Sequence, residues 1–95
     1  MEALLRAGLE IIFSSPLSTH FSGVSPEGAV FPYECIQQWD RITKTIVLQP
    51  DFAVNLKNCL EFRSPAPGRP RMLVHPEMIV SIKELATGEV LYPID

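Results

Sequence analysis

The sequence predicts a mainly β protein, built as a small antiparallel barrel or rolled sheet of SH3/Sm-like type, with a short helical turn allowed at the N-terminus. Apolar and polar residues alternate in several short stretches, as they do in half-buried strands. The 95 residues include nine prolines, which argues against long helices because proline interrupts helical hydrogen bonds. Turn-forming residues separate the alternating stretches. At this length we expect one domain, residues 1–95.

The N-terminal segment contains the first predicted elements. Residues 1–7 have the apolar edge of one or two helical turns, and Gly8 would end them. Leu9, Ile11 and Phe13 then recur at every second position and predict a strand.

Residues 14–42 are the segment whose structure the pattern determines least. Within it, Ser25-Pro26-Glu27-Gly28 predicts a type I turn that closes a loose hairpin. Residues 33–42 fit either a short helix or a strand. We favour the strand, because residues 43–48 that follow are rich in β-branched side chains and predict another one.

The strongest alternation in the chain lies in residues 52–62. One face holds Asn58 and five apolar side chains, namely Phe52, Val54, Leu56, Leu60 and Phe62. This pattern predicts one long strand, which must pair on both edges because it cannot stabilise itself. Asn58 conflicts with an apolar face, so the strand must bulge there or the amide must find a partner, since an unpaired buried amide costs about 1–3 kcal/mol.

The C-terminal third predicts short strands joined by tight turns. The expected strands are 72–74, 78–83 and 90–92, with turns at 75–77 and 86–89. In the second of these strands Met78, Val80 and Ile82 share the apolar face. Six or seven short strands around one core result, and such a sheet must close or be covered to bury its apolar face.

Charge and cysteine content narrow the function classes. The net charge of −3 disfavours strong non-specific nucleic-acid binding, which depends on neutralising phosphates. The N-terminus has neither the basic start nor the long apolar core of a secretory signal, and no stretch predicts a membrane span. We therefore expect a cytoplasmic protein with no membrane partner, in which Cys35 and Cys59 are reduced thiols.

The chain shows no spacing typical of a catalytic or metal site. Its histidines, His20 and His75, stand in predicted loops, and no close ligand pair such as C-x-x-C is present. The five glycines are isolated, so no phosphate-binding loop is predicted. We expect no enzyme activity, no cofactor and no metal. A pocket lined by Cys35, Trp39 and a histidine would instead indicate a small-molecule or enzyme role.

The segment 63–71 is the most unusual local feature. It contains Arg63, Arg69 and Arg71, three prolines and no acidic residue. Its prolines and glycine predict a loop rather than paired strand. The three arginines are candidate partner-binding residues, either as a basic finger on an acidic partner or within a polyproline-type segment that docks into an aromatic groove. A plain solvated connection is the alternative.

Two motifs carry a likeness to a known family. Residues 51–56 (Asp-Phe-Ala-Val-Asn-Leu) follow a β-branched strand and place an asparagine four residues after an aspartate. Residues 72–82 join two apolar strands through a two-residue signature and two variable residues. Through these motifs residues 43–84 resemble the Sm/LSm small-barrel family, although His75-Pro76 stand where that family usually has Arg-Gly.

The resemblance implies a bent five-stranded barrel, ring assembly by edge pairing, and a nucleic-acid pocket near Asp51, Asn55 and His75. From the residues themselves, the function we favour is a non-enzymatic interaction module. It would bind a protein partner, or itself as a homo-oligomer, through a sheet edge or the 63–71 loop. The alternative is an Sm-like ring protein that binds single-stranded RNA.

Overall fold

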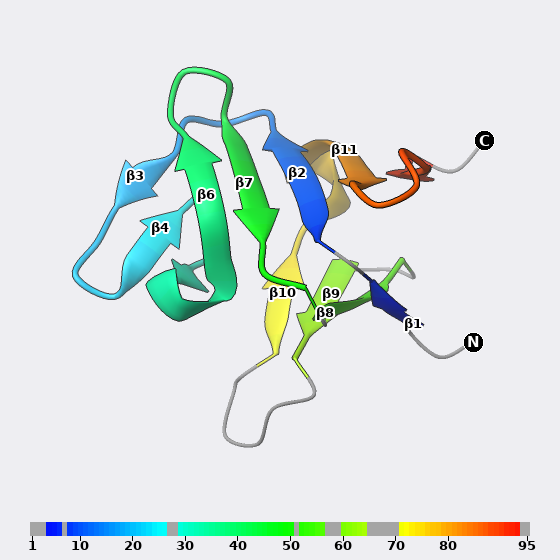
Figure 1. Cartoon of the computed structure of the whole chain (residues 1–95). Coiled ribbons are helices and arrows are strands. Elements are labelled where there is room, and N and C mark those ends of the chain that lie inside the picture. Colours follow the sequence, from blue (N-terminus) through cyan, green and yellow to red (C-terminus); the bar gives the residue numbers. More distant parts are fainter. Residues whose placement is uncertain are drawn as a thin grey trace.

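The computed structural model describes residues 4–6, 8–26, 29–50, 52–56, 60–64 and 71–93, and Figure 1 shows their arrangement. The strands form three antiparallel sheets, in the orders β1-β8-β9-β10, β12-β11-β2-β7-β6 and β3-β4-β5. We call them sheets A, B and C. The prediction of a mainly β, antiparallel protein is confirmed. Hydrogen bonds between the described strands form these three sheets and do not join them into a closed barrel.

Sheet B is the largest and contributes more buried side chains to the core than either of the other sheets. It contains β2 (Leu9–Phe13), β6 (Ile36–Asp40), β7 (Thr45–Leu48), β11 (Ile79–Glu84) and β12 (Val90–Tyr92). Ile11 of β2 lies opposite Ile46 of β7 and Ile82 of β11, and all three side chains are fully buried. The alternation of residues 9–13 therefore predicted both the strand and its buried face.

Sheet A shows where the predicted long strand was wrong. Its strands are β1 (Leu4–Arg6), β8 (Phe52–Asn55), β9 (Leu60–Arg63) and β10 (Met72–Val74). Residues 52–62 thus form two antiparallel strands, with Asn55 opposite Glu61 and Val54 opposite Phe62. This register is centred on Asn58, the residue that interrupted the apolar face, and Asn58 itself lies outside the described residues. Val54 and Phe62 still share one buried face, because paired residues point to the same side of a sheet.

The helical turn expected within residues 1–7 is also wrong for the part that the structure describes. Leu4–Arg6 form β1 and pair with β8, with Leu4 opposite Val54. Two leucines at a chain end are compatible with helix or strand, and the exposed edge of β8 provides backbone partners that a two-turn helix would lack. Gly8 has a φ of +67°, a conformation that glycine adopts without strain, between β1 and β2.

Sheet C is formed within residues 14–42, the segment whose secondary structure the sequence pattern determined least. It consists of β3 (Ser18–Thr19), β4 (Gly23–Ser25) and β5 (Phe31–Pro32). The predicted hairpin is confirmed, since β4 pairs with β5 and the amide of Ala29 donates to the carbonyl of Pro26 at 3.2 Å. The ambiguous residues 33–42 divide into a 3₁₀ turn, η1 (Tyr33–Cys35), and β6.

The C-terminal strands follow the prediction except for one face. After β10, a 3₁₀ turn, η2 (Pro76–Met78), leads into β11. The register of β11 against β2 shifts between Ile79 and Ser81. Because a bulge inverts the side-chain alternation, Ile79 and Ile82 are buried whereas Val80 is 53% exposed. The prediction that Met78, Val80 and Ile82 share a buried face is therefore wrong.

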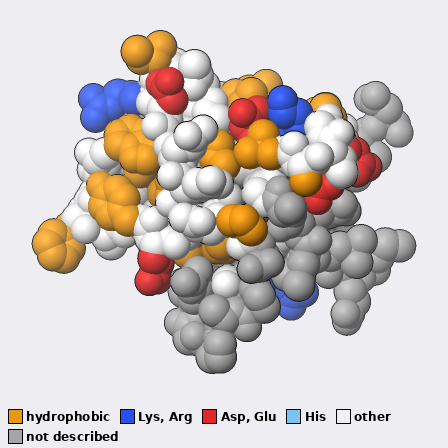
Figure 2. All heavy atoms as spheres, in the orientation of Figure 1, with side chains coloured by type: hydrophobic (Ala, Val, Ile, Leu, Met, Phe, Trp, Pro, Cys, Tyr) orange, Lys and Arg blue, Asp and Glu red, His pale blue; other side chains and the backbone are white. Residues whose placement is uncertain are grey.

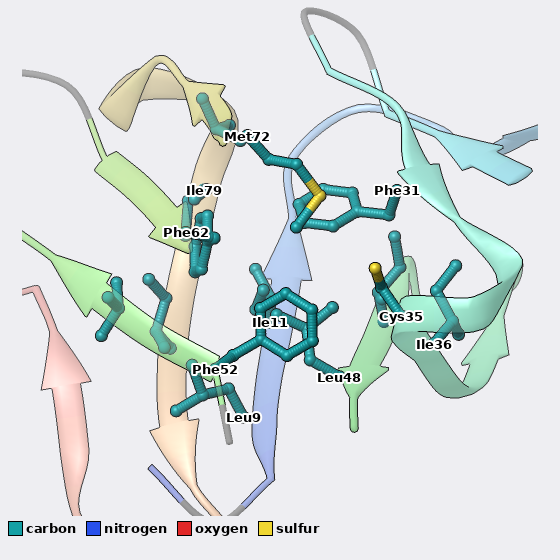
Figure 3. Close-up of a cluster of buried hydrophobic side chains, with 14 of the residues drawn as sticks. Leu9, Ile11, Phe31, Cys35, Ile36, Leu48, Phe52, Phe62, Met72 and Ile79 are labelled. Atoms are coloured by element: carbon teal, nitrogen blue, oxygen red, sulfur yellow. The ribbon is translucent and has the colours of Figure 1, made fainter. Parts of the chain in front are cut away.

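The core lies where the inner faces of the three sheets meet, as Figure 3 shows. Phe31 of sheet C is fully buried and its ring centroid lies 5.8 Å from the ring centroids of both Phe13 in sheet B and Phe62 in sheet A. One aromatic side chain thus contacts all three layers. In the described part of the chain, no helix has the length and apolar character needed to cross a membrane.

Candidate functional site

Two of the predicted arginines meet on the outer face of sheet A. Leu73 of β10 lies opposite Glu61 of β9, and both side chains point away from the core because their neighbours Phe62 and Met72 are buried in it. Arg63 Nε lies 3.6 Å from Glu61 Oε1, and an Arg71 terminal nitrogen (NH1) lies 3.1 Å from Glu61 Oε2. We call Glu61, Arg63, Arg71 and Leu73 the arginine surface.

The exposure of these side chains indicates what the ion pairs do. The side chain of Glu61 is only 13% exposed, whereas those of Arg63 and Arg71 are 46% and 68% exposed. Ion pairs this exposed contribute about 0–1 kcal/mol to stability. Their main effect is to orient two guanidinium groups that remain open to solvent, and the cluster keeps a net positive charge. Arg69, the third predicted arginine, lies outside the described residues.

The arginine surface belongs to a basic part of an acidic chain. Residues 52–76 contain four basic residues and one acidic residue, a net charge of +3. The rest of the chain contains four basic and ten acidic residues, a net charge of −6. Within the strands, Glu61 and Arg63 of β9 cancel, and the excess positive charge comes from Lys57, Arg69 and Arg71 in the connecting segments. This segregation along the chain favours an acidic partner near the 63–71 loop.

The residues of the expected nucleic-acid pocket are only partly described. Asp51 lies outside the described residues. Asn55 is half-buried at the end of β8, and His75 is exposed just after β10. Asn55 and His75 lie on opposite sides of β9, because β9 lies between β8 and β10.

The cysteine and histidine side chains do not form a reactive cluster in the described part of the structure. Cys35 is 3% exposed and its side chain belongs to the core, while Cys59 is outside the described residues. His20 is exposed in the turn between β3 and β4. Among the described residues, no three His, Cys, Asp or Glu side chains lie close enough together to hold a metal ion.

A groove that the sequence did not predict lies on the outer face of sheet B. Outward side chains of β2, β7 and β6 line it, among them Glu10, Ile12, Asp40 and Val47, together with part of Trp39, and its volume is about 480 Å³. Neither Cys35 nor a histidine lines it, so it is not the pocket that would indicate an enzyme role. The sequence shows the polar residues within 9–13 and 45–48. It does not show that β7 lies between β2 and β6, which brings them together.

Apolar side chains are also exposed in two turns of the molecule. Phe21 is fully exposed between β3 and β4, and Ile42 is 89% exposed between β6 and β7. Figure 2 shows hydrophobic side chains on the surface where β3, β4 and β6 lie. Phe21 and Ile42 lie in separate turns, and no ion pair orients charged side chains beside them among the described residues, so we place the candidate site at the arginine surface.

Comparison of the chain with protein-family models, with curated proteins and with solved structures finds no match.

Proposed function

We propose that the protein is a non-enzymatic interaction module that binds an acidic, partly apolar protein segment through the arginine surface. The observation that supports this proposal is an exposed leucine on an outer strand, beside two arginines oriented by one carboxylate. The proposal combines the two contact regions expected from the sequence, a sheet edge and the 63–71 loop, because Arg63 and Arg71 lie at the two ends of that loop.

The position of β10 supplies the apolar and backbone part of the contact. Among the described strands, β10 is one of the two outer strands of sheet A, and β1 is the other. Outer strands present unpaired backbone groups that can pair with another chain. Leu73 of this strand is 54% exposed, so a partner strand beside β10 would bury an apolar side chain as well as backbone groups.

The two guanidinium groups supply the charge selectivity. Arginine binds carboxylates through parallel N–H donors, and such charge-assisted hydrogen bonds are about twice as strong as neutral ones. Glu61 already restricts Arg63 and Arg71, so a partner carboxylate would meet guanidinium groups that have lost part of their rotamer freedom. A second copy of this chain is one possible source of the acidic segment, since its remaining residues carry a net charge of −6.

A labelled peptide of alternating glutamate and leucine tests this proposal directly. In fluorescence anisotropy at low salt, we expect saturable binding to the native chain. The double variant Arg63→Glu, Arg71→Glu should weaken the binding about tenfold or more, because two charge-assisted contacts are replaced by repulsion. A peptide with glutamine in place of glutamate should bind weakly to both proteins.

The matched control changes the same charge elsewhere. Arg41→Glu together with Lys44→Glu alters the net charge equally, in the turn between β6 and β7. This control should reduce affinity far less than the Arg63, Arg71 variant. Equal weakening by both double variants would show that only the overall charge matters, and the proposal would then be wrong. The native mass, measured by light scattering in reducing buffer, shows whether a second copy is the partner.

A second candidate, an Sm-like barrel that binds single-stranded RNA as a ring, is favoured by the order in which strands meet. β2 bonds to β7, and β7 runs on into β8, which bonds to β9. β9 bonds to β10, which leads through η2 into β11, and β11 bonds back to β2. This circular path is compatible with an SH3/Sm-like barrel. A native species of six or seven copies that binds oligouridine in a salt-sensitive manner would support this candidate. A monomer that does not bind RNA would exclude it.

A further inference from the structure

The outward side chains along β10 differ in chemistry from one position to the next. Met72 and Val74 are buried in the core, whereas Leu73 between them is 54% exposed. Arg71 precedes β10 and lies on the same face as Leu73, because it bonds to Glu61, the residue opposite Leu73. Residues two apart on a strand are separated by about 6.6 Å. A guanidinium group and an apolar side chain therefore follow each other on the outer face at that spacing.

This spacing determines which side chains a strand paired with β10 would place beside it. β10 pairs with β9 on one edge, and no described strand pairs with its other edge. Cross-strand neighbours on one face are the pairs that stabilise a sheet. The partner residue beside Leu73 should therefore be apolar, and the one beside Arg71 should be acidic. Since side chains alternate between the two faces, exactly one residue must separate these two in the partner.

Strand direction sets the order of the two residues. Every pairing between described strands in this chain is antiparallel, and antiparallel pairs are slightly more stable per residue than parallel ones. In an antiparallel partner strand, the residue beside Arg71 comes after the residue beside Leu73. The expected order from the N-terminal to the C-terminal side is therefore an apolar residue, any residue, and an acid.

A second copy of this chain does not present such a segment. Ile82-Lys83-Glu84 is the only place in the sequence where Leu, Ile, Val, Met, Ala or Phe stands two residues before an acid. Ile82 and Glu84 are both buried, and their strand β11 is already paired on both edges, with β2 and with β12. The partner segment must therefore come from another protein.

We propose that the arginine surface recognises an extended segment of another protein with the order aliphatic residue, any residue, Glu or Asp, paired antiparallel with β10. The aliphatic side chain packs beside Leu73, and the carboxylate binds Arg71, whose guanidinium group Glu61 orients. This recognition pattern rests on the function proposed above, and it adds the spacing and the direction of the recognised residues.

Three labelled peptides of identical composition test the pattern. Each contains one leucine and one glutamate in a stretch of threonines, in the order Leu-Thr-Glu, Leu-Glu-Thr or Glu-Thr-Leu. Affinities are measured by fluorescence anisotropy at low salt and at about pH 8, above the range in which histidine titrates. The Leu-Thr-Glu peptide should bind the native chain about three- to tenfold more tightly than the other two, because only it forms both cross-strand pairs.

Exchanging the two recognition residues provides a matched variant. Arg71→Leu together with Leu73→Arg keeps composition and net charge, and both positions are exposed, so the variant should fold. Its preference should be inverted, with Glu-Thr-Leu bound more tightly than Leu-Thr-Glu. Equal affinity of the native chain for the three peptides, or an uninverted preference in the variant, would overturn the recognition pattern and leave the proposed function intact. Failure of the native chain to bind any of them, or the alternating glutamate and leucine peptide, would overturn both.

Discussion

Replacing Phe31 by alanine is expected to lower the free energy of unfolding by about 3–5 kcal/mol. Phe31 is fully buried, and its ring contacts Phe13 from sheet B and Phe62 from sheet A. The variant therefore loses transfer free energy, two aromatic contacts and the packing that joins three sheets. A domain of this size is stable by about 5–15 kcal/mol, so the loss removes a large share of its stability. Urea denaturation, followed by far-ultraviolet circular dichroism, measures it.

Phe21 provides a control of the same residue type. It is fully exposed, and Phe21→Ala should change the free energy of unfolding by no more than about 0.5 kcal/mol. If Phe31→Ala costs less than about 1 kcal/mol, or no more than Phe21→Ala, then the packing of Phe31 between the sheets does not hold the core together.

Replacing Gly23 by alanine is expected to have the second largest effect. A Cβ atom at position 23 would collide with the carbonyl oxygen of Phe31 and lie 2.8 Å from the Phe31 carbonyl carbon and 2.9 Å from Pro32 Cα. All three atoms are backbone atoms of the paired strand β5, so no side chain can rotate away. The strands β4 and β5 must separate, and we expect a loss of about 2–3 kcal/mol or more. Hydrogen exchange of the Tyr33 amide, which donates to the Ser22 carbonyl at 3.3 Å, should accelerate with it.

Gly88→Ala separates this collision from the ordinary cost of losing a glycine. At Gly88 no heavy atom lies within 4 Å of the added Cβ, and the φ is +74°. Alanine there costs only the backbone strain of about 1–2 kcal/mol and should not affect the Tyr33 amide. If Gly23→Ala is no more destabilising than Gly88→Ala and leaves that amide protected, the close approach of β4 and β5 is not maintained in solution.

The parts of the fold that the sequence predicted are those governed by local pattern. Alternation identified β2, the β-branched run identified β7, and the Ser25-Pro26 turn identified the hairpin of sheet C. These signals lie within a few residues of each other and need no knowledge of the partner strand. Where two structures have similar local signals, prediction was wrong, as in residues 52–62 and in the N-terminal segment. One long strand shows an unbroken alternation of apolar and polar residues. A hairpin shows the same alternation when the length of its turn keeps the apolar residues of both strands on one face.

The candidate sites were predictable only in part. Arg63 and Arg71 were visible as basic residues at the ends of a proline-rich loop. Their convergence on Glu61 depends on the pairing of β9 with β10, which places Glu61 opposite Leu73. The groove on sheet B depends in the same way on β7 lying between β2 and β6.

By itself, the sequence determined that this protein is mainly β, that its strands are short and antiparallel, and which side chains of β2 and β8 face the core. The tertiary structure decided that residues 52–62 fold back on themselves and that a bulge turns Val80 outward. It also decided which charged side chains are neighbours. The physical reason is that a period of two residues defines the two faces of a strand, whereas its partners and its register depend on contacts between residues far apart in the chain.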